Sequence, residues 1–140
     1  MKAYLDTNVL LDILMNSREQ HMDSATILRV AEKGAIQAFL STQSIIDAAY
    51  VFSQKEKIPV GQFKNAIRTL LGIVNVTSIS ENNIKAAIRS SFSDFEDAAQ
   101  LDCAADTECD VIISSDKKWK DNTAIPVYTP KEFCNLLFEA

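Results

Sequence analysis

The chain has 140 residues, 47% of them hydrophobic, and a formal net charge of −5. A chain of this length and apolar content can bury one core, so we expect residues 1–140 to form a single domain. The acidic balance is the wrong sign for binding nucleic acid through counterion release alone. Any nucleic acid would have to be recognised by a local arrangement of groups.

The cysteines and the N-terminus exclude several classes of protein. Cys103, Cys109 and Cys134 are odd in number and include no CxxC pair, which argues against a disulfide framework and a structural zinc site. We expect them to be small buried residues. Asp6 interrupts any signal-peptide apolar region, and no later apolar run approaches bilayer-spanning length. These features predict a cytoplasmic protein without a membrane segment.

Apolar periodicity and capping residues predict strands that alternate with helices along the chain. The strands are expected at residues 2–5, 36–40, 73–77, 110–114 and 125–128. The helices are expected at about residues 9–14, 18–33, 42–52, 60–71, 80–90 and 94–107, and from residue 130 onward. In the helix after the second strand, Ile46, Ala49, Tyr50 and Phe52 are expected to face the core.

This alternation predicts an α/β fold, a three-layer α/β/α sandwich with a five-stranded, mainly parallel sheet. In such sheets, ligands bind beyond the carboxyl ends of the strands. Asp6 ends the first strand, Asp47 lies early in the helix after the second, and Asp97 lies one turn into a helix that Asp94 caps. Asp116 follows the fourth strand, so these aspartates can converge on one edge.

Four ionised carboxylates in one cleft need protons or cations, because two unit charges ~4 Å apart repel by roughly 4 kcal/mol at an effective dielectric near 20. All-oxygen ligands without a nearby histidine or cysteine favour Mg²⁺ or Mn²⁺ over zinc. Such ions lower the pKa of bound water and stabilise a leaving oxygen, which is the chemistry of phosphodiester hydrolysis.

Each acidic position also has a structural interpretation. Asp6 and Asp94 can cap the helices that follow them, Asp47 can be a solvated helix position, and Asp116 can start a turn. We favour the functional role for Asp6, Asp47 and Asp116, and assign Asp94 a supporting role at most. The remaining candidates, Asp12, Asp102 and Asp106, are expected to be solvated helix positions, and His21 a surface residue.

Three acidic segments resemble the motifs of the PIN domain family in order and spacing. They are Asp6-Thr7-Asn8-Val9-Leu10-Leu11-Asp12, Asp94-Phe95-Glu96-Asp97-Ala98 and Ile113-Ser114-Ser115-Asp116-Lys117. The ending Ile125-Pro126-Val127-Tyr128-Thr129-Pro130 is similar to the last strand and helix of bacterial PIN proteins, so the resemblance covers nearly the whole chain.

The resemblance implies that Asp6, Asp97 and Asp116 are metal ligands and that Asn8 supports the site. It also implies a VapC-type ribonuclease toxin with a small antitoxin protein as partner, and a homodimer is possible. One position departs from the family: the second acid is usually glutamate, whereas the best match here is Asp47. The aspartate carboxylate reaches less far by about one C–C bond, ~1.5 Å.

Lys117, Lys118 and Lys120 surround Trp119 directly after Asp116 and offer positive charge and a stacking ring for RNA. The alternative, which we favour slightly, is an exposed loop in which Trp119 is a buried core residue.

Two other functions are compatible with these residues. One is a PIN-like module that binds RNA or a protein partner without cleaving it, with Asp47 as the sign of an impaired site. The other is a phosphoryl-transfer domain in which Asp6 accepts the phosphoryl group beside magnesium, helped by Ser114 and Lys117. The absence of a DxD after the first strand counts against the second alternative.

Overall fold

The computed structural model describes residues 1–139 and contains one five-stranded sheet in the order β3-β2-β1-β4-β5. All neighbouring strands are parallel, so the predicted α/β fold is confirmed. Each strand lies where the sequence predicts it, although β3, β4 and β5 are shorter than expected. The strands are β1 (Lys2–Leu5), β2 (Gln37–Ser41), β3 (Asn75–Thr77), β4 (Val111–Ile113) and β5 (Val127–Tyr128).

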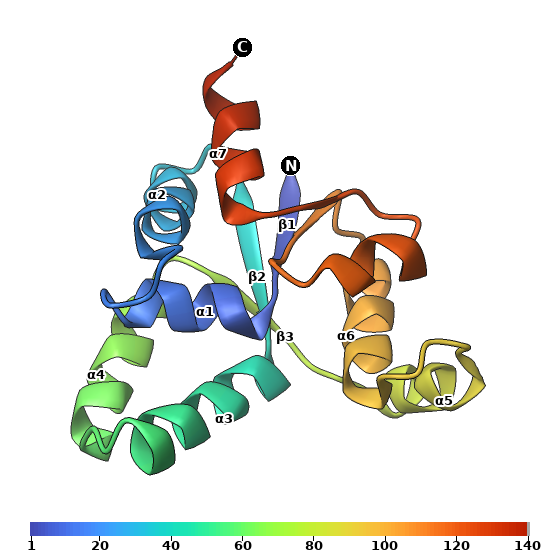
Figure 1. The fold of residues 1–140 in the computed structure, drawn as a ribbon, viewed down its shortest axis with the longest axis horizontal. Coiled ribbons are helices and arrows are strands. Elements are labelled where there is room, and N and C mark those ends of the chain that lie inside the picture. Colours follow the sequence, from blue (N-terminus) through green and yellow to red (C-terminus); the bar gives the residue numbers. More distant parts are fainter. Residues whose placement is uncertain (140) are drawn as a thin grey trace.

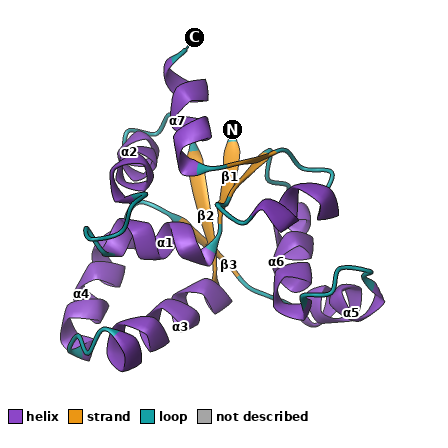
Figure 2. Cartoon of the chain, viewed as in Figure 1, coloured by secondary structure: helices purple, strands orange, loops and turns teal. Residues whose placement is uncertain are grey.

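The helices also follow the predicted order (Figure 2). Asp94 caps its helix as expected, and Ser41, Ser80 and Thr129 are N-caps as well; each of these four side chains accepts a hydrogen bond from the first turn of its helix. A π-helical turn at Val51–Lys55 and a 3-10 helix at Lys117–Asn122 were not predicted. The α-helices are α1 (Thr7–Leu14), α2 (His21–Glu32), α3 (Thr42–Tyr50), α4 (Val60–Leu70), α5 (Glu81–Arg89), α6 (Phe95–Asp106) and α7 (Pro130–Phe138).

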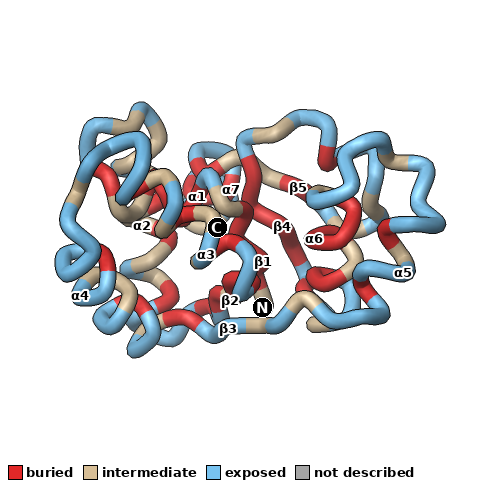
Figure 3. Tube along the Cα trace, turned by 90° about the horizontal axis from the view of Figure 1, so that it is seen from below, coloured by how far each residue is buried: buried red, intermediate tan, exposed pale blue. Residues whose placement is uncertain are grey.

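The sheet separates two hydrophobic cores, because successive side chains of a strand point to opposite faces. On β1, Ala3 and Leu5 join one core while Tyr4 joins the other. On β4, Ile113 joins the first core and Ile112 joins the second. β1 and β4 are therefore buried on both faces, as the burial view shows (Figure 3).

Helices cover both faces, as the three-layer prediction requires (Figure 1). Residues of α1, α2, α3, α4 and α7 pack into the first core, and α6 packs into the second. α5 lies outside α6 and packs against it through Ala87, Ala98 and Ala99. Among residues 1–139, no helix is both long and apolar enough to span a membrane.

The predicted inner face of α3 is wrong in part. Ile46 and Tyr50 are 65% and 61% exposed, whereas Ala48 and Phe52 are buried and Ile45 packs against the first core. The helix carries two adjacent apolar stripes, and the sequence periodicity does not decide between them. Cys103, Cys109 and Cys134 are free and buried, as expected.

Trp119 is fully buried in the second core, which confirms the core interpretation of this residue. We expect Trp119→Ala to lower the free energy of unfolding by about 3–5 kcal/mol, because it removes a large side chain and leaves a cavity. Urea denaturation followed by circular dichroism measures this loss. Leu71→Ala is the control, because Leu71 is 50% exposed, and its effect should stay within about 0.5 kcal/mol. Equal effects of the two variants would contradict the core assignment.

Candidate acidic site

Asp6 lies at the carboxyl end of β1, the central strand, and is only 6% exposed. Its backbone N–H donates to the carbonyl of Ile113 at 3.0 Å, which fixes it beside the end of β4. Its Oδ1 accepts from the N–H of Thr7 at 2.7 Å and caps α1. The capping interpretation and a role in a site are therefore compatible, because Oδ2 takes no part in the cap.

Ser114 connects two of the candidate acids. Its Oγ donates to Oδ2 of Asp6 at 2.8 Å and accepts from the N–H of Asp116 at 3.0 Å. Ser114 is 2% exposed, and its own N–H donates to the carbonyl of Tyr128 on β5 at 2.9 Å. The sequence analysis assigned Ser114 only to the phosphoryl-transfer alternative. The feature of the sequence that could have indicated the contact of Ser114 with both aspartates is its place directly after a buried strand.

Asp97 lies in the first turn of α6, and Asp94 caps that turn by accepting from the N–H of Asp97 at 3.0 Å. Asp97 is half-buried. The indole N–H of Trp119 is buried without a hydrogen-bond partner among residues 1–139, yet it faces Asp97 closely enough to lower the pKa of that carboxyl. Because burial has a larger and opposite effect, the pKa of Asp97 is raised overall.

The shifted pKa values indicate that three acids lie near one another. The pKa of Asp6 is raised to about 6, chiefly by burial and also by the charges of Asp97 and Asp116, while the hydrogen bonds from Ser114 and Thr7 act in the opposite direction. Asp94 and Asp116 also raise the pKa of Asp97. Asp6, Asp97 and Asp116 come from three separate segments, and the carboxyl of Asp6 at the end of β1 lies near enough to the other two to interact with their charges. The convergence of Asp6, Asp47, Asp97 and Asp116 on one metal site stays a prediction.

Asp47 has different neighbours. Its Oδ1 accepts from the side-chain amide of Gln43 at 2.8 Å, and its carboxyl group lies against that of Glu96. Hydrogen bonding to Asp47, followed by partial burial, raises the pKa of Glu96 to about 7. Asp47 is not among the charges that perturb Asp6 or Asp97 most strongly. The acid beside Asp47 is therefore Glu96, which the sequence analysis did not single out.

A buried polar network lies beneath these groups and centres on Gln100, which is 1% exposed. Its Oε1 accepts from the hydroxyl of Tyr4 at 2.7 Å and from those of Ser41 and Ser44 at 3.3 Å each. Its Nε2 donates to Oγ1 of Thr7 at 3.4 Å. One carboxamide thus joins α6 to β1, α1 and the start of α3.

The remaining predicted residues lie around this edge. Asn8 is exposed in the first turn of α1, and Lys117 and Lys118 are exposed after Asp116. Lys120 forms an ion pair with Glu132 of α7 at 3.7 Å. The proposed stacking role of Trp119 is wrong, because a ring with no exposed surface cannot stack on a base.

Two groups of aspartates outside the cluster are not simply solvated. Asp12 is 3% exposed and accepts from Nε of Arg18 at 2.7 Å and from the hydroxyl of Ser24 at 3.2 Å. Asp102 and Asp106 both accept from the side-chain amide of Asn83, at 2.7 and 2.8 Å. The latter arrangement reduces the repulsion expected for a like-charged pair one helical turn apart.

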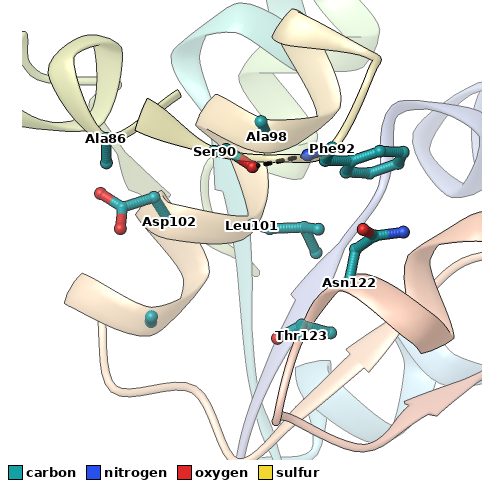
Figure 4. A pocket seen from close by; sticks show the side chains of 9 residues that line it. Ala86, Ser90, Phe92, Ala98, Leu101, Asp102, Asn122 and Thr123 are labelled. Atoms are coloured by element: carbon teal, nitrogen blue, oxygen red, sulfur yellow. Dashed lines mark hydrogen bonds between the residues drawn. The ribbon is translucent and has the colours of Figure 1, made fainter. Parts of the chain in front are cut away.

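A hollow of about 220 Å³ between α5, α6 and the 3-10 helix is separate from the acidic cluster (Figure 4). Ser90 lines it and accepts a hydrogen bond from the N–H of Phe92 at 3.0 Å. None of the candidate site residues contributes to its walls. Its one carboxylate, Asp102, is already bonded to Asn83. The hollow is therefore not part of the candidate site.

The donor set suits a hard divalent cation. The charges of Asp97 and Asp116 raise the pKa of Asp6, and the charge of Asp116 raises that of Asp97, so a bound cation would relieve this repulsion. Among residues 1–139, no three acidic, histidine or cysteine side chains are already grouped at metal-binding distances. The carboxylates therefore fit a hard cation by their chemistry, although they are not already grouped around one.

Together, the parallel sheet and the acidic edge define an α/β domain with a carboxylate-lined site. Residues 2–118 match the sequence profile of the PIN domain, and the chain therefore belongs to the PIN domain family. It is 28% identical over 141 aligned residues to Ribonuclease VapC1 of Aquifex aeolicus (strain VF5), covering 95% of this chain and 93% of the relative.

Solved structures share the fold. VapBC2 from Rickettsia felis, bound to a DNA fragment from its promoter, has a TM-score of 0.69 at 12% identity and covers 92% of this chain and 98% of its own. A toxin–antitoxin complex from Klebsiella pneumoniae has a TM-score of 0.63 at 22% identity, with 91% and 97% covered. VapC20 of Mycobacterium tuberculosis, a toxin that cleaves the sarcin-ricin loop, has a TM-score of 0.67 at 12% identity, with 85% and 93% covered.

The raised pKa of Asp6 predicts that this residue destabilises the metal-free protein at neutral pH. Below its unfolded value of 3.8 the group is protonated in both states, and as the pH rises towards about 6 the folded state ionises later and loses stability. A shift of this size corresponds to about 3 kcal/mol. We expect Asp6→Asn to be more stable than the wild type at pH ~7.5 by up to about that amount, with the difference shrinking towards pH ~4.

Urea denaturation with EDTA at both pH values measures this difference. The exposed residue Asp121 provides the control Asp121→Asn for the same chemical change. A wild type that is as stable as Asp6→Asn at neutral pH would show that burial does not penalise the Asp6 carboxylate.

Proposed function

We propose that the protein is an endoribonuclease that hydrolyses RNA phosphodiester bonds with Mg²⁺ or Mn²⁺, and that it is the toxin of a toxin–antitoxin pair. The observation that carries this proposal is that Asp97 and Asp116 lie close enough to Asp6, at the carboxyl end of β1, to raise its pKa. Membership of the PIN family and the similarity to Ribonuclease VapC1 support it.

Asp6, Asp97 and Asp116 would hold the cation. A bound divalent cation supplies a water of lowered pKa and stabilises the charge on the leaving oxygen. Ser114 orients Asp6 and the backbone of Asp116, and the Asp94 cap fixes the turn that carries Asp97. The exposed Asn8, Lys117 and Lys118 are placed to contact RNA near the acids, which a chain of net charge −5 can do only locally.

A small antitoxin as partner is supported by the toxin–antitoxin complexes among the structural neighbours. Toxins of such pairs act on RNA inside the cell, so a cytoplasmic location remains our prediction. A homodimer is also part of the proposal, since symmetric dimers are the commonest assemblies. We also propose that residues 1–140 form a single domain, which a profile match over residues 2–118 supports.

The second candidate function is a PIN-like module that binds RNA without cleaving it. The observation in its favour is the position of Asp47, whose carboxyl group lies against Glu96 rather than among the three clustered acids. If Asp47 cannot act on the substrate or the metal, cleavage would be weak or absent.

Asp97→Asn should abolish metal-dependent RNA cleavage. Loss of a residue that only supports a metal ligand costs roughly 10–100-fold, so loss of a direct ligand should cost about 100-fold or more. The measurement is cleavage of a mixed RNA pool by purified protein with Mg²⁺, Mn²⁺ or EDTA. Asp110→Asn is the matched control, because Asp110 lies at the opposite end of β4, where it accepts a hydrogen bond from the backbone N–H of Lys2.

Cleavage that needs metal, survives in Asp110→Asn and is lost in Asp97→Asn would support the ribonuclease. Equal cutting by all three proteins would identify a contaminating nuclease. Intact RNA that nevertheless binds to the wild type would favour the binding module.

Asp47→Asn should lower cleavage about tenfold if Asp47 acts in the site through a water or through Glu96. Asp47→Glu should keep cleavage at or above the wild-type level, because the longer side chain restores the reach usual in the family. Rates for both variants, measured with the same RNA and metal, test this role. Unchanged cleavage in Asp47→Asn would assign Asp47 a purely structural position.

A further inference from the structure

A second cleft of about 400 Å³ lies beside the acidic cluster, between α1 and the turn that leads into α2. Two of its lining residues adjoin the proposed metal ligands, since Asn8 follows Asp6 by two positions and Ser115 directly precedes Asp116. The cleft therefore lies next to the proposed site of cleavage. Its lining residues are Asn8, Asp12, Arg18, Glu19, Gln20 and Ser115.

Arg18 is the one cation in this lining, and its position is fixed. Its Nε donates to the buried Asp12 at 2.7 Å, and its side chain remains 33% exposed. The backbone around it forms successive turns, with the N–H of Arg18 bonded to the carbonyl of Met15 and that of His21 bonded to the carbonyl of Arg18. Within residues 1–139, neither Nη1 nor Nη2 of Arg18 donates a hydrogen bond to a protein acceptor.

The charge of the cleft argues against a phosphate as its ligand. Asp12 and Glu19 contribute two negative charges and Arg18 one positive charge, so a phosphate would meet a net repulsion. The lining instead mixes donors and acceptors, with the guanidinium, the amides of Asn8 and Gln20, and the carboxylate of Glu19. This mixture suits an uncharged planar ligand that presents both kinds of group.

We propose that this cleft binds a nucleobase next to the cleaved phosphodiester bond, and that guanine fits it best; the proposal rests on the ribonuclease function. Guanine presents two acceptors, O6 and N7, which match the forked donors of arginine. Its opposite edge presents N–H donors to a carboxylate such as that of Glu19. Unpaired bases of single-stranded RNA are recognised along both edges in this way.

Binding tests this subsite separately from cleavage. The Asp97→Asn protein, which cannot cut, is titrated with labelled single-stranded RNAs that differ at one nucleotide: G, A, C, U or 7-deazaguanosine, which lacks the N7 acceptor. We expect G to bind roughly tenfold more tightly than the other bases, because a bidentate arginine contact gives discrimination of about this size. 7-Deazaguanosine should lose most of that preference.

Arg18→Lys, added to Asp97→Asn, should remove the preference for G while leaving the other affinities nearly unchanged. Lysine keeps a cation near the buried Asp12, and circular dichroism checks that the fold is retained. Glu19→Gln, an exposed position, is a second variant that should weaken the preference without a folding risk. Arg68→Lys on the exposed face of α4, where Arg68 donates to Asn65, is the matched control and should change nothing.

Equal binding of all bases, or a preference that survives Arg18→Lys, would overturn the proposal. An equal loss of affinity for every RNA in Arg18→Lys would identify a phosphate contact and also overturn it. Cleavage by the Asp97-intact protein separates the two hypotheses. Metal-dependent cutting with unchanged sites in Arg18→Lys refutes the subsite alone, whereas G-selective binding without any cutting refutes the ribonuclease and leaves the base-binding cleft.

Discussion

The architecture of the acidic edge depends on one buried side chain, the carboxamide of Gln100. A buried hydroxyl or amide without a partner costs about 1–3 kcal/mol, so the polar groups beneath the site must satisfy one another. Gln100 does this by accepting hydrogen bonds from the hydroxyls of Tyr4 and of two serines, and by donating one to Thr7. Gln100 lies about one helical turn after Asp97 on α6. Its hydrogen bonds therefore also hold α6 where Asp97 lies near the carboxyl edge of the sheet.

The network also explains how a small domain keeps several carboxylates close together. Asp6 is placed by backbone and hydroxyl hydrogen bonds rather than by a neutralising base, and its pKa is raised because burial outweighs those bonds. At neutral pH the ionised carboxylate of Asp6 therefore lowers the stability of the folded state. A cation that bound the folded state and not the unfolded state would offset this loss, so the stability of the protein would be coupled to the occupancy of the proposed site.

The sequence was sufficient for the features that depend on local signals. The positions of the strands along the chain, the cap at Asp94, and the placement of Asp6 and Asp116 beyond the ends of strands all follow from periodicity, capping chemistry and the geometry of parallel sheets. These signals involve neighbouring residues or the general rule that strand ends share an edge.

The features that the sequence did not predict depend on contacts between distant segments. The choice between Ile45 and Ile46 as the inner residue of α3 is a rotation of the helix that only packing determines. The contact between Asp47 and Glu96 joins two helices about fifty positions apart in the chain, and no local pattern marks it. Asp12 was assigned to solvent because an aspartate in a helix usually is solvated, and its partner Arg18 lies beyond the end of that helix.

The burial of Asp12 has a consequence for how the two parts of the proposed site are arranged. Asp6 caps the first turn of α1, and Asp12 lies about 9 Å further along the same helix at 1.5 Å per residue. Asn8 and Asp12 are four positions apart and share one face of α1, which is the face that lines the cleft. Through its hydrogen bond to Asp12, the guanidinium of Arg18 is therefore held by α1, the same helix that Asp6 caps. A base bound there would have its distance from the acidic cluster set by helix geometry, without relying on a mobile loop, so selection of the base and placement of the scissile bond would be a single structural event.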